Sequence, residues 1–169
     1  MPAELVRRQL NIPNGFYTIM ITMGGVPNRY DYVRNLEKYH QLYFIIPGAS
    51  RRVIIQNNLR LLPHYSEFYH PDLINASDAV IGKAGYSTIA EIYYAGIPFG
   101  YISRPAFRES AKLTDFIKKN MSGISILEAE LHNGRWMDKI PDIMALPGFK
   151  PNTTNGADQI ADFIFNLPQ

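Results

Sequence analysis

Short apolar runs recur along this chain, and several of them stop at glycine or proline before a segment of helical pattern begins. Runs of this kind, rich in β-branched and aromatic residues, predict buried strands. Because helical segments separate the strands, the pattern favours a parallel sheet that is covered on both faces. The expected strands are residues 16–23, 42–46, 58–62, 79–81, 99–102 and 124–126.

The helical segments complete an α/β arrangement. The segment that follows residues 79–81 has Ser87 at its start, where a hydroxyl can cap the first turn of a helix. We therefore expect a three-layer, Rossmann-like domain over residues 16–169, with a mostly parallel six-stranded sheet and helices on both faces. Residues 1–15 are largely polar and predict a short helix and linker from a preceding domain. The expected helices are residues 31–39, 71–75, 87–94, 109–120, 138–145 and 157–165.

Composition narrows the classes of function. With 17 Lys and Arg against 15 Asp and Glu, the net charge of +2 creates no large field that would attract nucleic acid. The absence of cysteine excludes disulfides, a thiolate zinc site and a cysteine nucleophile. Neither a signal peptide nor a membrane-spanning stretch is expected, so we expect a soluble, cytoplasmic chain. The four histidines have no metal-ligand spacing and predict no metal site: His40, His64, His70 and His132.

The segment GKAGYSTIAE, residues 82–91, carries the clearest signal for a ligand. A glycine-bearing turn between a strand and a helix start leaves backbone amides free at the positive end of the helix dipole, which is a site for a phosphate. Lys83 can add a positive charge, and the hydroxyls of Ser87 and Thr88 can donate to phosphate oxygens. Glu91 lies one helical turn beyond Thr88, where its carboxylate can accept from two sugar hydroxyls. An ordinary strand-to-helix turn with a solvated Glu91 accounts for the same local pattern.

The order of residue types from Lys83 to Glu91 resembles the loop of UDP-dependent glycosyltransferases, in which a basic or polar residue precedes a glutamate by eight positions. Further motifs resemble, in order and spacing, the glycosyltransferase-like region ahead of the sugar-kinase part of plant arabinokinases. Residues 82–120 are also similar to MurG-type enzymes, which transfer N-acetylglucosamine. The arabinokinase-like motifs are MGGVP (23–27), PGAS (47–50), PDLINASD (71–78), GRW (134–136) and NG (155–156).

These resemblances imply the donor-binding, C-terminal half of a GT-B glycosyltransferase that binds a UDP-sugar and transfers a hexosyl or N-acetylhexosaminyl group. They assign the ribose to Glu91, and the region whose backbone pairs with uracil to residues 61–69. They assign the donor sugar to Arg104, Arg108 and Glu109, where the usual Asp-Gln or Gln-Gln pair is replaced. They assign the diphosphate to Gly24, Gly25, Lys83, Gly85, Tyr86, Ser87 and Thr88.

The resemblance also implies how the chemistry is divided. A helix terminus can stabilise the charge on a departing diphosphate, so no metal or other cofactor is expected. The general base is expected from an acceptor-binding N-terminal half, with peripheral membrane association through that half. Three interpretations remain open: a fragment of a glycosyltransferase, a separate donor-binding subunit that docks on a membrane partner as in the two-piece dolichol-linked N-acetylglucosamine transferase, and a non-catalytic nucleotide-sugar sensor or scaffold. We expect the isolated chain to bind a donor without appreciable turnover.

Overall fold

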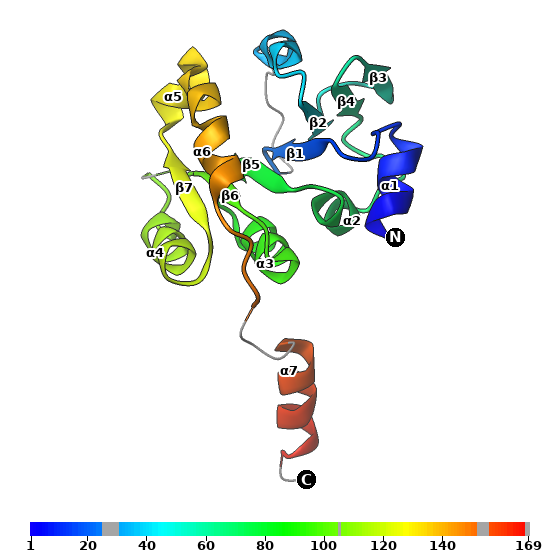
Figure 1. The fold of residues 1–169 in the computed structure, drawn as a ribbon. Helices are drawn as coiled ribbons and strands as arrows, with labels where there is room; N and C mark the ends of the chain where they lie inside the picture. The colour runs from blue at the N-terminus through cyan, green and yellow to red at the C-terminus, as the bar shows by residue number, and fades with distance from the viewer. Residues whose placement is uncertain (25–30, 105, 152–155, 168–169) are drawn as a thin grey trace.

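A single sheet forms the middle of the molecule in the computed structural model, which describes residues 1–24, 31–104, 106–151 and 156–167 (Figure 1). Within these ranges the sheet has seven strands in the order β3-β4-β2-β1-β5-β6-β7. The strands pair in parallel except at one edge, where β3 is antiparallel to β4. The expected fold class is confirmed, with one strand more than predicted. The strands are β1 (Tyr17–Thr22), β2 (Leu42–Pro47), β3 (Ile54–Gln56), β4 (Leu59–Leu62), β5 (Ala79–Lys83), β6 (Phe99–Ile102) and β7 (Gly123–Ile126).

Strand β3 is the edge strand that the sequence did not predict. It forms a hairpin with β4, in which Gln56 pairs with Leu59 across Asn57 and Asn58. Asn57 has a φ of 47°, a left-handed conformation that asparagine tolerates in tight turns. The strand has only three residues and no fully buried one, so it lacks the apolar run by which the other strands were recognised.

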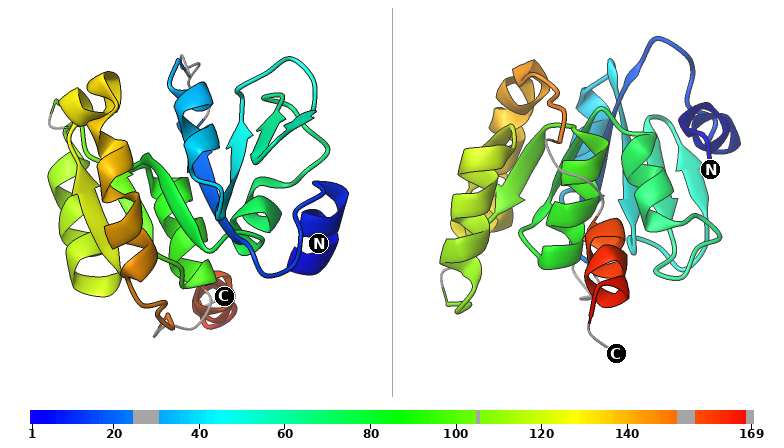
Figure 2. Two further views of the ribbon diagram at one scale, coloured as in Figure 1. Left: turned by 45° about the horizontal axis from the view of Figure 1, so that its top comes forward. Right: turned by 90° about the horizontal axis from the view of Figure 1, so that it is seen from below.

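Helices cover both faces of the sheet (Figure 2). One face is covered by η1 (Val33–Lys38), α5 (Glu128–Asn133), η2 (Arg135–Lys139) and α6 (Ile140–Ala145). The other face is covered by α1 (Ala3–Gln9), α2 (His70–Asn75), α3 (Tyr86–Ala95) and α4 (Ser110–Asn120). Helix α7 (Gly156–Phe165) stands away from the sheet in Figure 1, and its residues are all exposed. None of the helices in the described ranges is long and apolar enough to cross a bilayer.

Three helical segments differ from the prediction. Residues 31–39 form a 3₁₀ helix over Val33–Lys38 alone, and the segment 138–145 is divided between η2 and α6. Pro141 lies in the first turn of α6, where its lack of an amide costs no hydrogen bond, so a new helix can begin there. Helix α5 was not predicted because its six residues are too few to show a helical period and, unlike α2, it has no proline that marks its start.

The pleat of the strands divides the core into two clusters. In β1, Ile19 and Ile21 belong to the cluster under η1, α5 and α6, whereas Met20 belongs to the cluster under α1 to α4. Successive side chains point to opposite faces of a strand, so a strand that is buried on both faces reads as an unbroken apolar run. Trp136 is fully buried in the first cluster and meets Tyr32 edge to face, with ring centroids 5.1 Å apart.

The buried side chain of Arg60 on β4 ties the N-terminal segment to the sheet. Its guanidinium donates to the carbonyl oxygen of Leu10, to that of Asn11 at 2.6 Å and to that of Leu59 at 2.9 Å. Burial lowers the pKa of the Arg60 guanidinium, while the ring of Tyr43 lies 4.7 Å from the guanidinium carbon. The segment that leads from α1 into β1 is therefore held against β4 by charge-assisted hydrogen bonds.

Replacement of Arg60 with leucine is expected to lower the free energy of unfolding by about 2–4 kcal/mol, because buried carbonyl groups lose their donors. Urea denaturation followed by the fluorescence of Trp136 measures this change. The matched control is Arg52→Leu at an exposed position, which should change the free energy by less than about 0.5 kcal/mol. Equal effects of the two substitutions would contradict the anchoring role.

Candidate functional site

The described residues of the predicted site lie at or after the carboxyl ends of β1, β5 and β6, which meet at one edge of the sheet. The chain passes from β1 to β2 on one side, and β5 lies on the other side of β1. The strand order therefore reverses between β1 and β5, and ligands of α/β sheets bind beyond the strand ends at such a point. Gly24 follows β1, residues 84–88 follow β5 and Arg104 follows β6.

Gly82 near the end of β5 and Gly85 in the loop after it are glycines for different physical reasons. A Cβ atom on Gly82 would lie 2.3 Å from the carbonyl oxygen of Thr22, so only glycine allows β1 and β5 to approach this closely. Gly85 has a φ of −125°, which any residue can adopt, and a Cβ atom there would meet nothing within 4 Å. The fold therefore requires glycine at position 82, whereas glycine at position 85 leaves open space in front of helix α3.

Helix α3 begins at Tyr86 with its first amides unpaired. Gly85 is its N-cap, so the prediction that Ser87 caps the helix is wrong; the extended glycine lets the helix start earlier and places Ser87 in the exposed first turn. The amide of Ala84 donates to β6, and the amide of Ile89 donates to the carbonyl oxygen of Gly85 at 2.9 Å. Between them, the amides of residues 85–88 make no hydrogen bond within the described part of the chain. They form a cluster of free donors at the positive end of a ten-residue helix.

Glu91 does not lie free on the surface of α3. Its Oε2 atom is 2.6 Å from Nδ1 of His70, the first residue of α2, and Nε2 of His70 is 3.2 Å from the hydroxyl of Thr22. The amide of Gly24 donates to the same hydroxyl oxygen at 3.3 Å. The structure thus joins the loop after β1 to the predicted ribose residue through His70, which sequence reasoning did not assign. No sequence pattern connects positions 70 and 91.

A hollow of about 260 Å³ connects the loop after β5 with the loop after β6. It brings Gly85 and Tyr86 together with two predicted sugar-binding residues, Arg104 and Glu109. The guanidinium of Arg104 lies 3.9 Å from the ring centroid of Phe107, a cation–π distance that orients the arginine at the rim. The lining residues are Ala84, Gly85, Tyr86, Arg104, Phe107, Glu109, Ser110 and Leu113.

The other predicted residues that the structure describes do not line this hollow. Lys83 is the half-buried last residue of β5, and Gly24 has a φ of 67°, which favours glycine. Arg108 is exposed and lines a neighbouring hollow with Lys118, so the structure separates it from Arg104 and Glu109. Gly25 lies outside the described residues. The ligand roles assigned to all these positions remain predictions.

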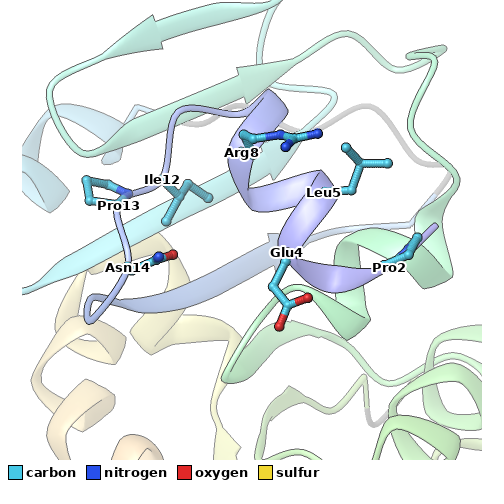
Figure 3. A pocket seen from close by; sticks show the side chains of 7 residues that line it. All are labelled: Pro2, Glu4, Leu5, Arg8, Ile12, Pro13 and Asn14. Carbon is cyan, nitrogen blue, oxygen red and sulfur yellow. The ribbon is translucent and has the colours of Figure 1, made fainter.

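A second hollow, of about 630 Å³, lies at the N-terminal segment (Figure 3). Helix α1 and the segment that leads into β1 form it, and it contains none of the predicted site residues. Its charged side chains, Glu4 and Arg8, have opposite signs, so it offers no preference for an anion. Within the described ranges, no group of three or more His, Asp and Glu side chains is placed to hold a metal ion.

Comparisons with known proteins agree with this arrangement. No family model matches the chain. Over 159 residues it is 24% identical to an L-arabinokinase of Arabidopsis thaliana, an alignment that covers 94% of this chain and 15% of that protein. Over 143 residues it is 28% identical to the UDP-N-acetylglucosamine–N-acetylmuramyl-(pentapeptide) pyrophosphoryl-undecaprenol N-acetylglucosamine transferase of Halalkalibacterium halodurans, covering 81% of this chain and 37% of that protein. The crystal structure of the glycotransferase of kitacinnamycin matches its fold with a TM-score of 0.60 at 10% identity, covering 79% of this chain and 36% of that chain.

The fold and these matches define the class: the chain has the fold of one half of a GT-B glycosyltransferase. It is distantly homologous to the arabinokinase and to the N-acetylglucosamine transferase, and it spans only 15% and 37% of their lengths. The family resemblance inferred from the sequence motifs is confirmed.

The contrast between the two glycines gives a prediction about stability. Gly85→Ala should change the free energy of unfolding by less than about 1 kcal/mol, because the new methyl group enters open space. Gly82→Ala should lower it by about 3 kcal/mol or more, because the methyl group would overlap a backbone oxygen. Thermal denaturation of both variants beside the wild type tests this. A strongly destabilised Gly85→Ala variant would show that the fold requires glycine at position 85.

Proposed function

We propose that this chain is the donor-binding half of a GT-B glycosyltransferase, and that it binds a UDP-sugar beyond the carboxyl ends of β1 and β5. The donated group is a hexosyl or N-acetylhexosaminyl unit, and the protein acts in the cytoplasm. The observation that carries the proposal is the uncapped N-terminus of α3, where the amides of residues 85–88 have no partner in the described part of the chain and Gly85 leaves open space beside them.

The chemistry of a diphosphate fits this helix terminus. Free amides and the helix dipole favour an anion, and Lys83 at the end of β5 adds a full positive charge near the same loop. When the sugar is displaced, negative charge grows on the diphosphate leaving group. The amides and Lys83 then stabilise the transition state more than the ground state, as catalysis requires.

The other parts of a nucleotide sugar have candidate positions on either side of the diphosphate. Glu91 accepts from the ribose hydroxyls, and the donor sugar enters the hollow that contains Arg104 and Glu109. The base lies toward residues 61–69, where Tyr69 is exposed directly before α2. An arginine and a glutamate in place of an amide pair can both bind sugar hydroxyls, but with a different pattern of donors and acceptors.

Helix α7 supports the requirement for an acceptor-binding half. Ile160, Phe163 and Ile164 are spaced as one apolar stripe on the helix, and Leu167 follows just beyond its end; each of these side chains is about half or more exposed. A stripe of this length without a covering surface is typical of an interface. We propose that it docks on the acceptor-binding half, in the same polypeptide or as a separate subunit with peripheral membrane contact, and that this half supplies the general base.

The alternative to a glycosyltransferase is a nucleotide-sugar sensor or scaffold, for which transfer by the assembled protein would be absent.

Calorimetric titration with UDP, UDP-N-acetylglucosamine, UDP-arabinose and GDP-mannose tests donor binding. Glu91→Ala should weaken the binding of UDP compounds by about 1.5–3 kcal/mol, because two hydrogen bonds to a charged group are lost. Gly85→Ala should also weaken it, by placing a methyl group where the diphosphate lies. The control is Glu128→Ala on α5, at the opposite face of the sheet, with no effect expected. Unchanged affinity of the Glu91 variant would reject its role, and failure of all four ligands to bind would reject the proposed site.

Substitution of the apolar stripe tests the docking of α7. Because none of its residues belongs to the core, Phe163→Asp combined with Ile164→Asp should leave the melting temperature and the UDP affinity of the isolated chain unchanged. The same change in the assembled protein should abolish transfer of labelled sugar. Asp162→Ala, on the same helix but outside the stripe, is the matched control and should keep activity. A stripe variant with full transfer activity would contradict this role of α7.

A further inference from the structure

Three side chains from three elements form a continuous hydrogen-bonded chain behind the proposed ribose position. Thr22 is the buried last residue of β1, His70 is the first residue of α2 and Glu91 lies in the second turn of α3. A carboxylate can only accept, so the 2.6 Å contact requires Nδ1 of His70 to donate to Glu91. In the neutral imidazole, Nε2 then accepts from the hydroxyl of Thr22, whose oxygen in turn accepts from the amide of Gly24. Each donor in this series of hydrogen bonds has one acceptor.

These hydrogen bonds restrict the orientation of the Glu91 carboxylate. The side chains of His70 and Glu91 are 32% and 25% exposed, so the pair is reachable from solvent yet partly desolvated. His70 occupies Oε2 of Glu91, while Oε1 has no partner among the described residues. A flexible glutamate loses rotational freedom when it binds a ligand, and a carboxylate already held by a second residue has less to lose.

We infer that His70 is a positioning residue, which holds the Glu91 carboxylate in the orientation that accepts the vicinal 2′- and 3′-hydroxyls of a ribonucleotide, and that Thr22 holds the imidazole ring in place through Nε2. The inference rests on the proposed nucleotide site. A vicinal diol needs two acceptor positions at a fixed spacing, which a carboxylate provides only when its plane is fixed. Discrimination between ribose and 2′-deoxyribose should therefore depend on His70.

Two substitutions of His70 distinguish the role of Nδ1 from the role of Nε2. The side-chain amide nitrogen of asparagine lies near the position of Nδ1, and that of glutamine lies near the position of Nε2. His70→Asn therefore keeps a donor for Glu91 and loses the contact with Thr22, whereas His70→Gln keeps the contact with Thr22 and loses the donor for Glu91. A residue that serves only to fill space would respond alike to both changes.

The measurement is the ratio of the dissociation constants of 2′-deoxy-UDP and UDP, obtained by calorimetry on the whole chain. The wild type should prefer UDP by about tenfold or more, as expected for a hydroxyl bound to a charged acceptor. In His70→Asn this ratio should stay within about threefold of the wild-type ratio. His70→Gln should reduce it about fivefold or more, with little change in the affinity for 2′-deoxy-UDP. Equal ratios in both variants would overturn the inference while leaving the proposed function intact.

A second measurement needs no nucleotide. Nitrogen-detected NMR of the labelled imidazole reports which ring nitrogen carries the proton, and His70 should be protonated at Nδ1 in the wild type. Thr22→Val, which removes the hydroxyl at nearly constant volume, should leave the proton on Nδ1, because the Glu91 carboxylate can only accept. A wild-type ring protonated at Nε2 alone would overturn the positioning role even if UDP binds. Failure of UDP to bind would instead overturn the proposed function, and with it the role in ribose recognition.

Discussion

Strands β1 and β5 lie side by side in parallel, with Thr22 opposite Gly82 where both strands leave the sheet. This pairing allows no side chain at position 82, because the backbone oxygen of Thr22 occupies the place of a Cβ atom. It is also the point at which the strand order reverses, so two loops and the start of α3 open toward the same space. The loop of residues 84–88, the hydroxyl of Thr22 and the amide of Gly24 all take their positions from this contact.

The electrostatic character of the site comes mainly from the backbone. The chain as a whole is nearly neutral, and Arg60, the most deeply buried arginine among the described residues, binds carbonyl groups at the part of the sheet near β4. At the edge near α3, the positive potential arises from free amides and the helix dipole, with Lys83 as a local addition. Such a site favours an anion without a large charged surface, as the proposed binding of a diphosphate requires.

Local pattern predicted much of the fold because most strands are buried on both faces and read as unbroken apolar runs. It failed where burial or length was small: β3 is a short exposed edge strand, and α5 is a six-residue helix. It also placed the start of α3 at Ser87, because a hydroxyl is a common cap, whereas an extended Gly85 begins the helix at Tyr86. The loop itself was found because its glycines, hydroxyls and Glu91 follow one another within ten positions.

What the sequence determined by itself is therefore local: the strand and helix periods, the glycine-bearing turn and the spacing from Lys83 to Glu91. The tertiary structure decided which distant residues meet there. It joined His70 and Thr22 to Glu91, brought Arg104 and Glu109 beside Gly85, and directed Arg108 elsewhere. The physical reason is that backbone periodicity and turn chemistry act over a few residues, whereas contacts across 20 to 50 positions depend on the order in which strands pair.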